Sequence, residues 1–129
     1  IESHITRGGK RRAFQQEENY HGRYEKYQQG RGPDPARSGR YQPSEVVSRT
    51  LAQNEHVSVT LFSFDKGEEI STHESGGDAM VTCLDGVGRI TIDGKDYELH
   101  EGESIVMPAR HPHAVYGQEQ FKMLLVVVF

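Results

Sequence analysis

The chain has 129 residues, close to the usual length of a single domain, so a second independent core of ordinary size is not expected. Hydrophobic residues make up 34% of the chain, and no apolar run approaches the roughly 20 residues needed to cross a bilayer, which argues against a membrane protein. The single cysteine, Cys83, excludes an intramolecular disulfide framework, and no leader segment is evident. A cytoplasmic location is therefore expected.

The net charge of -4 conceals two segments of different composition. Residues 1–40 hold nine Lys and Arg against five Asp and Glu, and only eight of them are hydrophobic, whereas residues 41–129 hold six against 14 and 36 hydrophobic residues. Only the second segment has enough apolar side chains to bury a core. We expect a basic arm at 1–40, extended or disordered, followed by one folded domain at 41–129.

From Val57 onward, short β-branched or aromatic runs alternate with turn residues at intervals of roughly 8–12, the spacing of an all-β sandwich or barrel. The clearest element is a hairpin over residues 89–97, which turns at Asp93-Gly94. The expected strands are Glu45–Leu51, Val57–Phe64, Ala79–Leu84, Gly88–Ile92, Tyr97–Leu99, Ser104–Met107, Ala114–Tyr116 and Lys122–Phe129.

The last expected strand is apolar at every position from Met123 to Phe129, unlike a strand with one solvated face. Both of its faces must be covered, either inside the sheet or by a second copy of the chain. The sequence does not separate the two, and we expect a homodimer.

The histidines gather around two turns. His73 follows Gly67 by six positions, and His111 and His113 flank Pro112. These two segments resemble the two motifs of the cupin superfamily. The first motif is a glycine, five residues, His-x-His, three or four residues, Glu, six residues and a glycine, and the chain matches it from Gly67 to Gly86. The second, a glycine, five residues and Pro-x-Gly-x-x-His, is matched from Gly102 to His113.

The resemblance covers about residues 43–129 and implies a jelly-roll barrel, also called a double-stranded β-helix, whose two sheets enclose a ligand cavity. It also implies a metal site with His73, Asp78 and His113 as ligands. The second histidine of the first motif is replaced by Ser75, which could hold a metal-bound water.

Alternation along an extended chain supports the same assignment, because His73 and Ser75 then point to one side and Glu74 to the other. Two imidazoles and a carboxylate are the donor set of a facial triad, which suits non-haem Fe(II), with Mn, Ni, Co and Zn as competitors. The expected lining of the adjoining pocket is Ser75, Met80, Thr82, Phe62, Met107 and Tyr116.

Three functions fit these features. A metal with open positions implies a dioxygenase, isomerase or decarboxylase acting on a small organic molecule. The incomplete motif equally fits a metal-free barrel that binds or senses a small molecule without turnover. A basic arm that binds nucleic acid is the least favoured, because no ordered RNA-binding signature is present. The sequence leaves open whether the protein is an enzyme.

Overall fold

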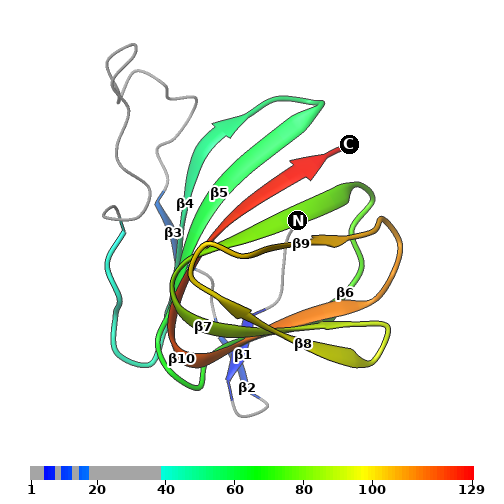
Figure 1. Ribbon diagram of the computed structural model, residues 1–129. Coiled ribbons are helices and arrows are strands. Elements are labelled where there is room, and N and C mark those ends of the chain that lie inside the picture. Colours follow the sequence, from blue (N-terminus) through cyan, green and yellow to red (C-terminus); the bar gives the residue numbers. More distant parts are fainter. Residues whose placement is uncertain (1–4, 8–9, 13–14, 18–38) are drawn as a thin grey trace.

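The computed structural model describes residues 5–7, 10–12, 15–17 and 39–129, and the chain forms β-strands and no helix within them (Figure 1). The all-β prediction is confirmed. Nor does this part of the chain contain a helix with the length and apolarity that a membrane span requires. The strands are β1 (Ile5–Arg7), β2 (Lys10–Arg12), β3 (Gln15–Glu17), β4 (Val46–Gln53), β5 (Val57–Phe64), β6 (Glu69–His73), β7 (Asp78–Ile92), β8 (Lys95–His100), β9 (Ser104–Met107) and β10 (His113–Val128).

Two strands, β7 and β10, are long enough to belong to both layers of the barrel. The second half of β10 pairs with β5 and with the first half of β7, which gives the first layer, in the order β3-β4-β5-β10-β7-β9. The first half of β10 pairs with β6 and with the second half of β7, which gives the second layer, in the order β2-β1-β6-β10-β7-β8. Figure 1 shows the two layers folded over each other.

Glycines allow the two long strands to bend where they pass from one layer to the other. The register between β7 and β10 shifts between Gly117 and Phe121. Opposite that shift, Gly86 has a φ of 77° and lies against the backbone of Gln120, and Gly88 lies against the Phe121 ring. The sequence predicted two separate strands here, Ala79–Leu84 and Gly88–Ile92, with turn residues between them. The chain instead bends there without leaving the sheet, because β10 bends beside it.

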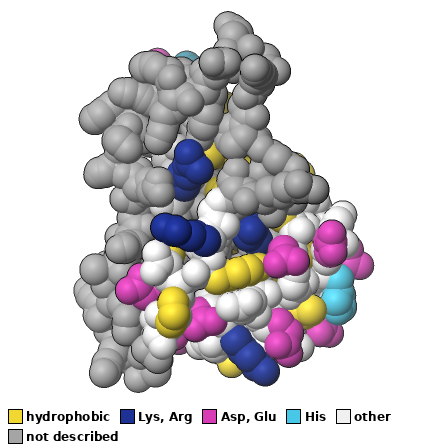
Figure 2. Space-filling view, turned by 90° about the vertical axis from the view of Figure 1, so that its left-hand side faces the viewer, with side chains coloured by type: hydrophobic (Ala, Val, Ile, Leu, Met, Phe, Trp, Pro, Cys, Tyr) yellow, Lys and Arg dark blue, Asp and Glu magenta, His cyan; other side chains and the backbone are white. Residues whose placement is uncertain are grey.

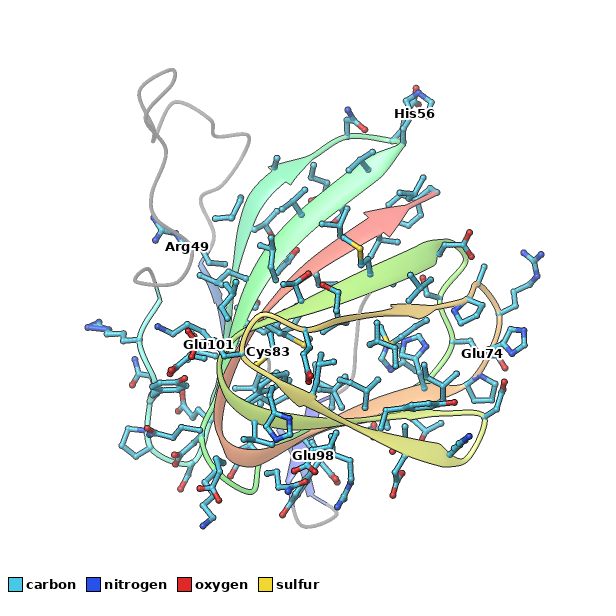
Figure 3. All side chains as sticks on the ribbon, viewed as in Figure 1. Arg49, His56, Glu74, Cys83, Glu98 and Glu101 are labelled. Atoms are coloured by element: carbon cyan, nitrogen blue, oxygen red, sulfur yellow. The ribbon has the colours of Figure 1, made fainter. Side chains whose placement is uncertain are left out.

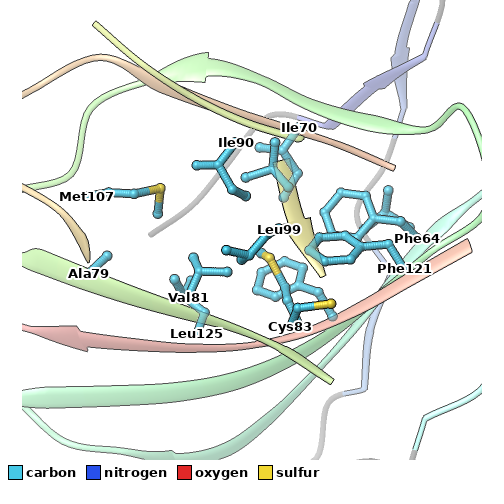
Figure 4. Packing of buried hydrophobic residues seen from close by; sticks show 14 of the residues in the cluster. Phe64, Ile70, Ala79, Val81, Cys83, Ile90, Leu99, Met107, Phe121 and Leu125 are labelled. Atoms are coloured by element: carbon cyan, nitrogen blue, oxygen red, sulfur yellow. The ribbon is translucent and has the colours of Figure 1, made fainter. Parts of the chain in front are cut away.

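The core lies between the layers and is built from alternate residues of each strand. On β7 these are Ala79, Val81 and Cys83, all almost fully buried. Phe64 and Phe121 fill one end of the core, with ring centroids 5.4 Å apart, and Met107 lies toward the opposite end (Figure 4). The layers therefore hold an apolar core between them and leave polar side chains to the ends.

Short pieces of the basic segment add strands to the barrel edges. β1 pairs with β6 at the edge of one layer, and β3 runs parallel to β4 at the edge of the other. Most of residues 1–40 lie outside the described residues, so the boundary at residue 40 and the nucleic-acid hypothesis stay predictions.

Candidate functional site

Two histidines from different strands meet at one end of the second layer. His73 ends β6, His113 begins β10, and the two residues are direct cross-strand partners. Their ring centroids lie 4.5 Å apart with the ring planes inclined by 66°, and His113 is only 1% exposed. The sequence placed these two residues together, and the structure does so as well.

A β-bulge turns His73 to the same side as His113. Ile70 pairs with Val115 and His73 with His113, so three steps along β6 match two steps along β10. Without the extra residue, strict alternation from the buried Ile70 would point Thr72 inward and His73 outward. Bulges often re-aim side chains beside functional sites, and here the bulge builds the pair.

Each imidazole is held by a backbone carbonyl that fixes its tautomer. Nδ1 of His73 donates to the carbonyl oxygen of Ser71 at 2.9 Å, and Nδ1 of His113 donates to that of His111 at 3.2 Å. A carbonyl only accepts, so Nδ1 carries the proton in each neutral ring and Nε2 carries a lone pair. Both Nε2 atoms are buried and neither has a hydrogen-bond partner.

The electrostatics of the site favour a neutral His113 ring. Burial lowers the pKa of His113, and the neighbouring His73 lowers it further. The two ring centroids lie 4.5 Å apart, and neither buried Nε2 atom has a hydrogen-bond partner. This arrangement costs free energy unless a cation or a hydrogen-bond donor occupies the space between them.

The structure does not add Asp78 to the histidine pair. Asp78 is exposed, and its Oδ1 accepts a hydrogen bond of 2.8 Å from the backbone nitrogen of Ala109. The adjacent position, Ala79, is the one that points inward on β7. Across the described part of the chain, no group of three or more His, Cys, Asp or Glu side chains is placed to hold a metal.

Ser75 takes part in closing the loops around the pair rather than in contacting it. Its Oγ accepts a hydrogen bond of 3.2 Å from the backbone nitrogen of Gly77, and its carbonyl accepts one of 2.8 Å from Arg110. Arg110 has a φ of 65° and stands where the second cupin motif has glycine. The loops 74–77, 93–94 and 108–112 surround the pair, and we call this end of the barrel the mouth.

Three of the expected pocket residues face away from the barrel interior. Met80 and Thr82 lie on the outward face of β7, because Ala79, Val81 and Cys83 occupy its inner face. Tyr116 lies outward on β10 because it alternates with the buried Val115, and the Arg89 guanidinium stacks 4.4 Å from its ring centroid. The sequence interpretation of these three residues is wrong. Phe62 and Met107 do face inward, as part of the apolar core.

The second layer also brings residues to the mouth that the sequence analysis missed. Ile92 pairs with His113 on one side and with Lys95 on the other, and Tyr97 pairs with Ile90. Paired residues share a face of the sheet, so Lys95 and Tyr97 lie on the same face as His113. The two-residue turn at Asp93-Gly94 fixes this register and was readable from the sequence.

A cavity among the described residues lies away from the histidine pair, against the outside of β4 and β5. It has a volume of about 430 Å³ and is lined by Gly39, Arg40, Gln42, Val47, Ser48, Arg49, Leu61 and Ser63. On this side of the molecule, Lys and Arg side chains stand near the centre, and many Asp and Glu side chains gather to the right (Figure 2). This cavity is separate from the histidine pair.

Cys83 lies inside the barrel, well away from Glu74 at the mouth (Figure 3). Burial raises the pKa of its thiol to about 11, from a usual value of 9.0. At pH 8 this leaves roughly a hundredfold less thiolate than in an exposed cysteine. We expect a thiol-reactive dye to label the native protein at least a hundredfold more slowly than the protein unfolded in urea. Equal rates would show that the thiol is accessible.

The chain matches the family model described as the cupin domain over residues 60–129. A protein of unknown function from Streptococcus pyogenes is 48% identical with a TM-score of 0.74, and the match covers 78% of this chain and 89% of that one. A cupin superfamily protein from Desulfitobacterium hafniense is 33% identical with a TM-score of 0.75, covering 80% and 94%.

A third match is a cupin 2 conserved barrel domain protein from Leptotrichia buccalis, 44% identical with a TM-score of 0.70, covering 70% of this chain and 44% of that one. No curated protein matches the chain. The matched motifs, the two-layered barrel and these relatives agree, and the chain belongs to the cupin superfamily.

Proposed function

We propose that the protein binds a small organic molecule at the mouth, next to a divalent transition metal ion held by His73 and His113. One observation carries the proposal, namely the two buried Nε2 atoms that have no hydrogen-bond partner. A metal ion between the two imidazoles would satisfy both lone pairs at once.

The surroundings of each ring fit a metal ligand. Ligating histidines usually donate their other ring nitrogen to a carboxylate or a backbone carbonyl, and both Nδ1 atoms here donate to carbonyls. Neutral imidazole suits Fe, Ni, Co, Mn and Zn to different degrees, and availability would select among them. With two protein ligands, most coordination positions are left to water and to the organic molecule.

When bound, a metal of this kind would polarise a carbonyl or enediol oxygen, which is the chemistry of a dioxygenase, isomerase or decarboxylase. The residues of the chain would bind and orient the molecule. Tyr116 and Glu98 do not supply a base at this site, because Tyr116 faces outward and Glu98, the partner of Arg89 on β8, shares that outer face.

A metal-free binding module is the second candidate. The inward position of β7 is Ala79, which cannot bind a metal. Among the described residues, only the two imidazoles come together as candidate metal ligands. A ligand that carries two hydroxyl groups could satisfy both Nε2 atoms by donating hydrogen bonds to them. Such a protein would bind or sense the molecule without turnover.

Metal content separates the two candidates. We expect the protein, purified without a metal-binding tag, to bind Ni²⁺ or Zn²⁺, and His73→Ala to lower the affinity at least about tenfold because one of two ligands is lost. His113→Phe should do the same while keeping the buried volume filled. Isothermal titration of the apo protein measures both effects.

Glu74→Ala is the matched control, because Glu74 is exposed beside His73 and is not one of the proposed ligands. It should keep the wild-type affinity. A wild-type protein that binds neither ion would refute the metal site and leave the metal-free module. Unchanged affinity in both histidine variants would show that the ion binds elsewhere.

We also propose that two copies of the chain pair through the outer face of the first layer. Val59, Val126, Met80 and Val106 stand in register across β5, β10, β7 and β9, and we call them the apolar row. Met80 is 42% exposed and Val106 54%, and Val128 and Phe129 extend the same surface.

The charged side chains of this face lie beyond the row. Asp78 pairs with Val128 at one end, and Asp85 pairs with Lys122 at the other. A chain of net charge -4 can therefore bring two copies together here without placing like charges against each other at the centre. This pairing would also cover the second face of the C-terminal strand.

A further inference from the structure

The side chains on the inner face of β8 become more exposed to solvent toward the mouth. Leu99 is buried in the core, Tyr97 is 37% exposed and Lys95 is exposed. All three share a face, because successive side chains alternate and Tyr97 pairs with the fully buried Ile90. Strand β8 ends its layer, so this face opens to solvent beside the histidine pair.

One row of the sheet connects Lys95 to the histidines. His73, His113, Ile92 and Lys95 are successive cross-strand partners on β6, β10, β7 and β8. With neighbouring strands about 4.8 Å apart, the backbones of His113 and Lys95 are separated by about 10 Å. A small organic molecule can span that distance between the two side chains.

The ammonium group of Lys95 lies 5.4 Å from the centroid of the Tyr97 ring. No carboxylate of the described residues lies within ion-pair distance of it. The nearby Asp93 accepts a hydrogen bond of 2.7 Å from His111, and Asp96 accepts one of 2.7 Å from Thr91. The Lys95 ammonium group therefore has no ion-pair partner among the described residues and can contact an anionic ligand directly.

We propose that the molecule bound at the mouth is an organic carboxylate with an apolar or aromatic body. Lys95 binds the carboxylate, the Tyr97 ring packs against the body, and the other end of the molecule reaches His73 and His113. This inference rests on the proposed function and deepens it by naming the ligand class. It makes Lys95 a specificity-determining residue rather than a metal ligand.

The test compares 4-hydroxybenzoate with 4-hydroxybenzamide, which has nearly the same shape and no charge. Both carry a hydroxyl that can donate to an imidazole Nε2 atom. The imidazole NMR signals of His73 and His113, followed during titration of the full chain, report binding at the mouth. We expect the carboxylate to shift both signals and to bind at least about tenfold more tightly than the amide, because a charge-assisted contact is lost in the amide.

Variants at one position assign the effect. Lys95→Met should remove the preference for the carboxylate, and Lys95→Arg should retain it. The control is Lys66→Met, because Lys66 is an exposed lysine just before β6, away from the mouth, where it pairs with Glu119 at 3.5 Å. It should leave the preference unchanged.

Three results would overturn the inference: equal binding of the two compounds, a preference that survives in Lys95→Met, or no shift of either histidine by either compound. A parallel titration with Ni²⁺ distinguishes the causes. If Ni²⁺ shifts both histidines and the carboxylate does not, the ligand class is wrong and the metal site stands. If neither shifts them, the proposed function fails as well.

Discussion

Replacing Gly86 with alanine is expected to lower the free energy of unfolding by about 4 kcal/mol or more, which is a large part of the stability of a single domain. An added Cβ would lie 1.6 Å from the carbonyl oxygen of Gln120. The obstacle is backbone within the sheet, so it cannot rotate away as a side chain would. The bend of β7, and with it the passage between the layers, depends on this close approach.

Gly94→Ala separates the close contact from the cost of a positive φ. Gly94 has a φ of 81°, close to the 77° of Gly86, but a Cβ there meets nothing within 4 Å. Its replacement should cost only about 1–2 kcal/mol, the usual penalty of the left-handed region. Urea unfolding of both variants gives the comparison. Similar midpoints would mean that β7 and β10 can separate at Gly86 without loss of packing.

Met80→Glu is expected to convert the proposed dimer into a folded monomer. Met80 stands inside the apolar row, between Val126 and Val106, so a carboxylate there is removed from water when two copies pair. Two-fold symmetry introduces the charge twice. At about 3 kcal/mol or more in total, dissociation becomes over a hundredfold more favourable. Light scattering across a micromolar concentration series measures the change.

Gln53→Glu makes the same change of charge at the exposed end of β4, outside the row, and should leave the dimer intact. A wild-type chain that remains monomeric at these concentrations would contradict the proposed interface. So would a Met80→Glu protein that stays dimeric with an unchanged circular dichroism spectrum.

Local turn chemistry made much of the second layer predictable. Asp93 and Gly94 have φ angles of 52° and 81°, the positive values that a two-residue hairpin turn needs, and they lie where the sequence placed the turn. The pairing of His73 with His113 also followed from the two motifs. In both cases short sequence motifs carried the signal.

Features set by contacts distant in sequence were not predictable in the same way. The bulge that turns His73 inward depends on how β6 aligns with β10, some 40 residues later, and alternation alone gives a different orientation. Asp78 stands where the first motif has its glutamate, but the face it takes was set by the packing of Ala79, Val81 and Cys83 on β7. The same packing turned Met80 outward into the proposed interface.

Strand β10 is long enough to contribute to both the histidine pair and the apolar row. His113 stands at its start and Val126 near its end, and its neighbours β5, β6 and β7 cover most of its backbone hydrogen bonds. A strand paired along both edges does not detach locally, so its amide groups exchange with solvent only when the barrel opens as a cooperative unit. The histidine pair and the apolar row thus share one opening equilibrium, and pairing of two copies would rigidify the mouth by suppressing it.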